Sequence, residues 1–149
     1  MTHTHPDPAS PYTLAPTLLF SPVISTSTAP VLFEMDSSEA VFFLTPVIGP
    51  TSVCLMHVLT AWCKAHQGGQ FEVQLPDLSA ALGVSSTTLR NTLERLRRFN
   101  FLHPHGGTPL RSEVLTELRI YPVRWLAQLT PAARSTLIDW QRTLGAVVG

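Results

Sequence analysis

Apolar residues recur at helical spacing between residues 50 and 99, and short turn signals divide this stretch into separate elements. A turn at residues 49–52, with proline and hydroxyl residues, predicts the start of a helix that continues to about His66. The glycines of the Gln67-Gly68-Gly69 segment end it. Residues 70–75 alternate between apolar and polar, which predicts a short strand.

Two further helices are predicted directly after this strand. Pro76 and Asp77 begin the first of them, and Gly83 ends it. Ser85 is suited to cap the second, which continues to about Phe99. Its leucines fall at i, i+4 and i+7 and so form one apolar stripe: Leu89, Leu93 and Leu96.

The segments on either side of this region are less regular. Residues 1–11 have no apolar periodicity and are expected to form a frayed tail. Residues 12–46 contain short apolar runs separated by prolines, among them LLF, VLFEM and AVFFL. These runs predict strands, or extended arms that lie over a partner. Residues 36–39 are interpreted as a helix cap or a turn.

A β-hairpin and two helices are predicted after residue 99. Residues 101–103 and an alternating segment from Val114 form the hairpin, with a Gly/Pro-rich loop at residues 104–109. Helices follow at 125–129 and 131–148. The last carries an apolar stripe that needs a partner, and pairing with a second copy of the chain is the natural way to bury it: Leu137, Trp140, Leu144 and Val147.

The order of elements predicts an α+β fold that is mainly helical. It divides into an N-terminal tail and apolar extension (1–48), a helical core with its hairpin (49–121) and a C-terminal helical segment (122–149).

Composition and charge narrow the class of protein. Apolar residues make up 44% of the chain and charged residues only 13%, so some apolar surface is expected in a subunit interface. No apolar run approaches the ~20 residues of a membrane span. The N-terminus lacks the features of a secretory signal, so the protein is expected to be cytoplasmic and to have no membrane partner. Two cysteines cannot make a disulfide framework.

The net charge is zero, but the charges are unevenly distributed. Residues 1–63 contain four acids and neither Lys nor Arg, whereas residues 83–111 contain five Arg and only one acid, Glu94. Such a basic region gives a local positive field that attracts phosphate.

The segment LPDLSAALGVSSTTLRNTLERLRRFNFL resembles the DNA-binding module of winged helix-turn-helix regulators of the MarR and GntR type. Ser79 stands where the family usually has Ala, and Gly83 supplies the turn between the two helices. The similarity covers residues 50–121 in architecture and is most specific over 76–99. It implies a winged helix-turn-helix fold and a regulator, most simply a repressor, that binds double-stranded DNA as a homodimer.

Candidate DNA-binding residues follow from the chemistry of the third helix and the hairpin. Arg and Asn side chains pair with the edges of guanine and adenine, and N–H groups at a helix start favour phosphate. The expected base contacts are Ser86, Thr87, Arg90 and Asn91. Ser85 and Ser86 are expected to bind a DNA phosphate. Arg95, Arg98 and Arg111 are expected to contact the DNA backbone, Arg111 from the wing.

The sequence is also compatible with other functions. A winged helix that docks on a protein of the transcription or replication machinery is the main alternative, and a replication initiator is another. Cys63, His66, His103 and His105 have the donor types of a zinc site, but no metal or other cofactor is expected. No catalytic constellation is present in the sequence, so an enzyme is not expected.

Overall fold

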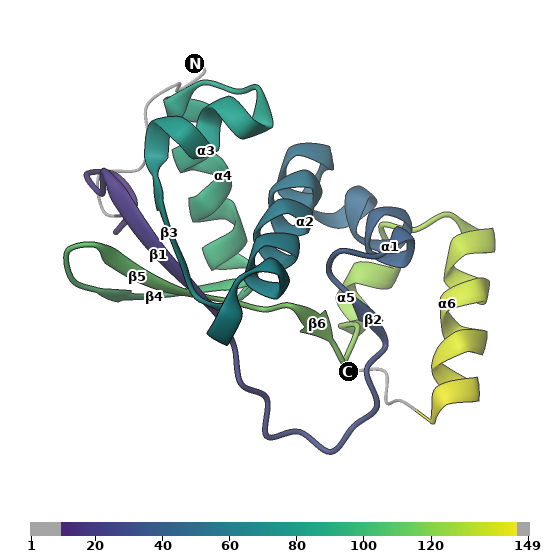
Figure 1. Ribbon diagram of the computed structural model, residues 1–149. Coiled ribbons are helices and arrows are strands. Elements are labelled where there is room, and N and C mark those ends of the chain that lie inside the picture. Colours follow the sequence, from purple (N-terminus) through teal and green to yellow (C-terminus); the bar gives the residue numbers. More distant parts are fainter. Residues whose placement is uncertain (1–9, 146–149) are drawn as a thin grey trace.

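The computed structural model describes residues 10–145, and the α+β class is confirmed (Figure 1). The helices of this part are α1 (Ser38–Ile48), α2 (Pro50–Ala65), α3 (Leu75–Leu82), α4 (Ser86–Arg98), α5 (Val123–Leu126) and α6 (Pro131–Leu144). The strands are β1 (Thr17–Pro22), β2 (Phe33–Glu34), β3 (Phe71–Gln74), β4 (Leu102–Gly106), β5 (Leu110–Val114) and β6 (Glu117–Leu118), and a 3-10 turn, η1, spans Gln67–Gly69.

The elements predicted between residues 49 and 99 are confirmed. Helix α2 begins after Gly49, which has a φ of 88°, and ends at the glycine-containing turn η1. Strand β3 and helices α3 and α4 follow in the predicted order. Helical spacing and clear turn residues agree over this stretch, so local and tertiary preferences point to the same structure.

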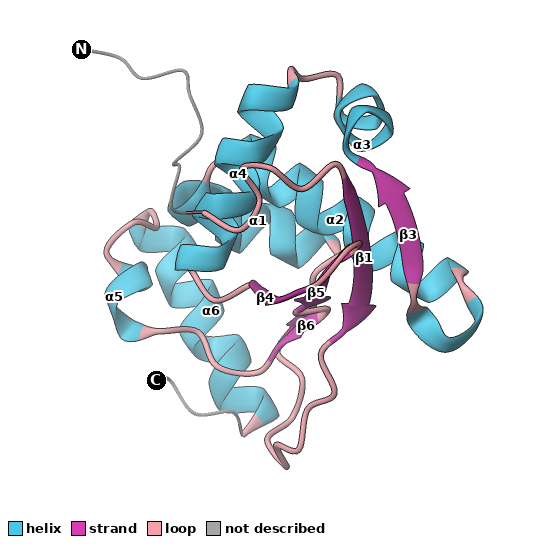
Figure 2. Ribbon diagram, turned by 90° about the vertical axis from the view of Figure 1, so that its left-hand side faces the viewer, coloured by secondary structure: helices cyan, strands magenta, loops and turns pink. Residues whose placement is uncertain are grey.

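Strand β1 lies in the middle of the main sheet, whose order is β3-β1-β5-β4. It runs antiparallel to β3 and parallel to β5 (Figure 2). The N-terminal LLF run is therefore a central strand that separates the β4–β5 hairpin from β3.

The hairpin begins where the sequence predicts, but its second strand begins earlier in the chain. Its second strand is β5, at Leu110–Val114, and not the segment that begins at Val114. Residues beyond Val114 turn away, and β6 pairs instead with β2 in a second, two-stranded sheet. Alternation along β5 is hidden in the sequence because one of its inward positions is polar: Ser112 is fully buried.

The AVFFL run is helical, and the prediction of an extended segment there is wrong. Ser37 caps α1 by accepting a hydrogen bond of 3.2 Å from the backbone N–H of Ala40. The helix packs on α2, and its residues Phe43, Leu44 and Val47 are buried. Residues 36–39 thus begin a helix, as their capping pattern indicates.

The C-terminal helix α6 packs partly on its own chain. Leu137 is fully buried, and the Trp140 ring lies 6.2 Å from the Phe43 ring of α1. Leu144 is 36% exposed, and Val147, the last member of the predicted stripe, lies outside the described residues. The N-terminal extension, the middle region and the C-terminal helices all contribute to one hydrophobic core. Within residues 10–145 no helix has the length and apolar character needed to cross a bilayer.

Candidate nucleic-acid interface

The α3–α4 pair is joined by a tight turn whose geometry depends on Gly83. Gly83 has φ 69° and ψ 31°, a left-handed conformation that glycine adopts without steric cost. The backbone N–H of Val84 then donates to the carbonyl of Ser79 over 3.1 Å. Ser85 begins α4 by accepting a hydrogen bond of 3.1 Å from the N–H of Thr88. The turn therefore sets the position of α4 relative to α3.

The apolar stripe of α4 faces the core as predicted. Leu89, Leu93 and Leu96 are fully buried, and Thr92 beside them is 7% exposed. At 100° per residue, two other stripes remain on the helix surface. One holds Ser86, Arg90, Glu94 and Arg97, and the other holds Thr87, Asn91, Arg95 and Arg98.

The first of these, the covered stripe, lies against the segment that precedes β1. Arg90 donates from Nε to the carbonyl oxygen of Tyr12 over 3.1 Å. Tyr12 is fully buried, and its hydroxyl shares a hydrogen bond of 2.7 Å with Ser112 of β5. The segment thus links α4 to the sheet, and Arg90, predicted to contact bases, is engaged by the protein's own backbone.

Glu94 is the charged centre of the covered stripe and is only 4% exposed. Its carboxylate accepts hydrogen bonds of 2.8 and 2.5 Å from Arg97 and one of 3.0 Å from Arg98. Hydrogen bonds from Arg97 are the largest influence on the pKa of Glu94 and lower it, whereas burial raises it. Hydrogen bonds from Ser10 and Arg98 lower it further, and the pKa falls to about 2. Glu94 is therefore ionised at neutral pH and neutralises part of the arginine charge on this helix.

The second stripe, the open stripe, consists of Thr87, Asn91, Arg95 and Arg98, at i, i+4, i+8 and i+11. Asn91 and Arg95 are exposed, and Thr87 is half-buried near the helix start. The Arg95 guanidinium lies 5.6 Å from the centre of the Phe99 ring. Arg98 contacts Glu94 but its side chain is 62% exposed. The open stripe presents an amide and two guanidinium groups to solvent.

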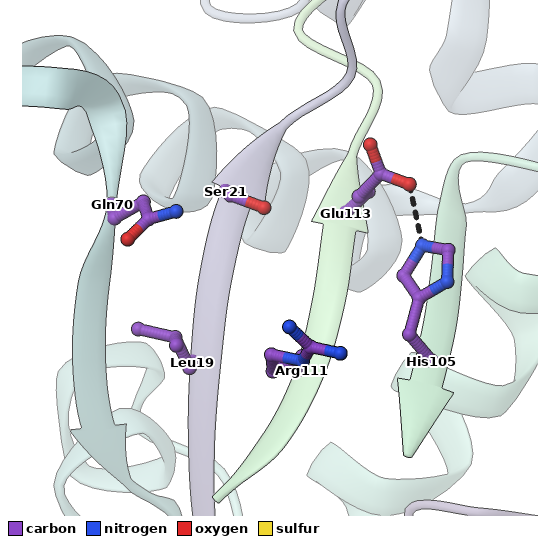
Figure 3. Close-up of a pocket in the computed structure, with 6 residues that line it drawn as sticks. All are labelled: Leu19, Ser21, Gln70, His105, Arg111 and Glu113. Atoms are coloured by element: carbon purple, nitrogen blue, oxygen red, sulfur yellow. Dashed lines mark hydrogen bonds and ion pairs between the residues drawn. The ribbon is translucent and has the colours of Figure 1, made fainter. Parts of the chain in front are cut away.

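Arg111 lies on a different surface from the open stripe. Along β5, Leu110, Ser112 and Val114 are buried while Arg111 is exposed, so its side chain leaves the sheet on the outer face. Figure 3 shows it there between Leu19 of β1 and His105 of β4. Ser112, on the inner face, contacts Tyr12 on the side of α4. The structure therefore does not bring Arg111 together with Asn91.

The predicted residues thus fall into three groups. Thr87, Asn91, Arg95 and Arg98 form the open stripe, beyond the exposed cap Ser85. Ser86, half-buried, and Arg90 belong to the covered stripe. Arg111 lies on the outer face of the sheet. The contacts that Ser10 and Tyr12 make with α4 were not predicted. The one hint in the sequence was the isolated acid Glu94 in an arginine-rich helix.

The four candidate zinc ligands, Cys63, His66, His103 and His105, do not form a site. Within residues 10–145 no three His, Cys, Asp or Glu side chains are arranged to hold a metal ion. Cys63 is buried in the core, and the His66 ring stacks on Phe71, with Nδ1 2.7 Å from the Trp62 carbonyl. His105 pairs with Glu113 of the next strand.

No family model, curated protein or solved structure matches the chain.

Proposed function

We propose that the chain is a winged helix-turn-helix protein that binds double-stranded DNA through α4 and regulates transcription. The observation that supports this most directly is the open stripe, an exposed row of Asn91, Arg95 and Arg98 on the helix that follows a tight turn. The order α2, β3, α3, α4 and the β4–β5 hairpin is that of a winged helix, with β1 as an added strand.

The chemistry of the open stripe suits a major groove. An Asn amide can pair with adenine N6 and N7, and an Arg fork with guanine O6 and N7 or with a phosphate. The four residues span 11 positions, or about 16 Å along the helix axis. We assign Asn91 and Thr87 to base contacts, and Arg95 and Arg98 to bases or backbone. Arg90 serves instead to position α4 through Tyr12.

The electrostatics of α4 point the same way. The helix carries four Arg against one Glu, and Glu94 is buried on the covered stripe whereas Asn91 and Arg95 are exposed. The positive field is therefore directed to the exposed side, where a phosphate backbone would approach. Regulation as a cytoplasmic homodimer, most simply as a repressor, remains part of this proposal.

The test uses the purified chain and a pool of random duplexes. We expect duplex binding at low salt, with an affinity that falls steeply as salt rises. Asn91→Ala should change the selected sequences at one base position. Arg95→Ala should weaken binding to all duplexes and reduce the salt dependence by about one ion.

The matched control is Arg142→Ala, which removes an exposed cation from α6, away from α4 (Figure 1). It should bind and select as the unaltered protein does. If Asn91→Ala and Arg95→Ala also match the unaltered protein, α4 does not contact DNA and the proposal is wrong.

A second candidate function is docking on another protein. It is favoured by an apolar hollow of about 390 Å³ between α1 and α2, lined by Val41, Thr45, Pro50, Val53, Cys54, His57 and Val58. Phe42 of α1 is 58% exposed. An adaptor of this kind would not bind random duplexes even at low salt, which separates the two candidates.

A further inference from the structure

The outer face of the main sheet carries a polar hollow of about 270 Å³. Six residues line it: Leu19, Ser21, Gln70, His105, Arg111 and Glu113 (Figure 3). They come from β1, β4 and β5 and from the residue just before β3, and their side chains lie on the side opposite the core. The volume lies just below the range of about 300–1,000 Å³ that is typical of small-molecule sites.

The hollow exists because of two features of β4. A register shift between Pro104 and Gly106 leaves His105 outside the regular pairing, and its Nε2 hydrogen-bonds Glu113. Gly106 then pairs with Arg111, and a Cβ at Gly106 would meet nothing within 4 Å. The position on β4 that pairs with Arg111 therefore carries no side chain.

Arg111 has no ion pair or hydrogen bond within residues 10–145, and neither do the side chains of Ser21 and Gln70. These three groups supply N–H and O–H donors around one hollow. Glu113 is the only acid among the six lining residues, and it is already paired with His105. The nearest other acid of the sheet is Glu72, which pairs with Leu19 on the far side of β1, two strands from Arg111.

We infer that this hollow binds a small molecule through a phosphate group. The Arg111 fork matches two oxygens of an oxyanion. The Ser21 hydroxyl and the Gln70 amide can donate to further oxygens, which a tetrahedral phosphate has and a carboxylate lacks. The site is independent of the DNA-binding proposal, because Arg111 and the open stripe lie on different surfaces.

The experiment is an NMR titration of the ¹⁵N-labelled full chain with inorganic phosphate, at constant ionic strength set with chloride. We expect saturable shifts of the amides of Ser21, Arg111 and Glu113. Acetate should bind about tenfold more weakly or not at all, because it offers fewer acceptors. Arg111→Gln should weaken phosphate binding about tenfold or more, and Arg142→Gln, the matched control, should leave it unchanged.

Gln70→Ala, an exposed change just before β3, provides a second variant and should also weaken phosphate binding. Absence of saturable shifts at these amides, or equal binding by all variants, would overturn the inference.

Binding of the same variants to duplex DNA distinguishes a small molecule from a DNA phosphate as the source of the oxyanion. We expect Arg111→Gln to keep its affinity for duplex, and Arg95→Gln to lose duplex affinity while keeping phosphate binding. If Arg111→Gln weakens duplex binding as much as Arg95→Gln does, the hollow holds the DNA backbone, and the small-molecule inference is wrong. Failure of duplex binding in every variant would contradict the proposed function alone.

Discussion

The buried carboxylate of Glu94 makes a specific prediction about stability and pH. Its pKa is lowered from 4.5 to about 2, chiefly by Arg97, so the native state favours the ionised form. Since one pKa unit corresponds to about 1.4 kcal/mol, the full shift is equivalent to about 3 kcal/mol. Arg97 and Arg98 are 39% and 62% exposed, so solvent screens the interaction and we expect Glu94→Gln to cost about 1–2 kcal/mol at pH 7.

The sign of the pH dependence follows from the lowered pKa. The unfolded state binds a proton near pH 4.5 and the folded state only near pH 2. The contribution of Glu94 is therefore complete above about pH 5 and is lost as the pH falls toward 2. The difference in unfolding free energy between the unaltered protein and Glu94→Gln should therefore become smaller as the pH falls over this range.

Urea unfolding followed by tryptophan fluorescence, at several pH values between 7 and 2, measures this difference. Asp139→Asn is the matched control, because Asp139 and its partner Arg142 are 74% and 76% exposed and their pair is 3.6 Å long. It should change the free energy of unfolding little at any pH. If Glu94→Gln costs the same at pH 7 and pH 2, the effect comes from packing and not from the carboxylate charge, and the reasoning is wrong.

Three further outcomes are expected. Tyr12→Phe should cost about 1 kcal/mol of unfolding free energy in thermal or urea denaturation, since it removes the hydrogen bond to Ser112. A double variant with Ser112→Ala should then cost less than the sum of the single changes, and full additivity would show that the two hydroxyls do not interact. Cys54 is exposed and should react rapidly with a thiol reagent at pH 8, whereas Cys63 should react only after unfolding, because burial raises its pKa to about 11. Two rapid thiols in the folded chain would contradict this. In fluorescence anisotropy with a labelled duplex, Arg95→Ala should lower affinity more at 50 mM than at 200 mM salt, and an equal loss at both would argue against a phosphate contact.

The part of the fold that could be predicted from sequence is the part in which local signals agree. Helix α4 has a capping serine, a leucine stripe and a glycine before it, and its bounds are close to the expected ones. Strand β5 was misplaced because Ser112 interrupts the apolar alternation. The burial of Ser112 depends on its contact with Tyr12, a residue 100 positions away. Helix α1 was missed because adjacent apolar residues and Pro46 obscure its helical spacing.

The candidate site was predicted in part for a similar reason. A helical projection separates the leucine stripe from the polar side, but it does not tell which polar residues the rest of the chain covers. Arg90 and Asn91 are neighbours in sequence, yet one contacts the Tyr12 carbonyl and the other is exposed. The segment that makes the difference has no apolar periodicity, so its docking was not visible in the sequence. Nor does alternation along a strand show which face of the sheet Arg111 occupies until the register is known.

The central place of β1 has a consequence for how the chain folds and how it can be cut. The β4–β5 hairpin can form from near neighbours, but a two-stranded hairpin alone is marginally stable in water. Its partner β1 pairs Leu18 with Leu110, a loop closure of ~90 residues that slows folding. A fragment that begins at α2 would lack β1, so β3 would have no strand partner and β5 would become an open edge prone to aggregation.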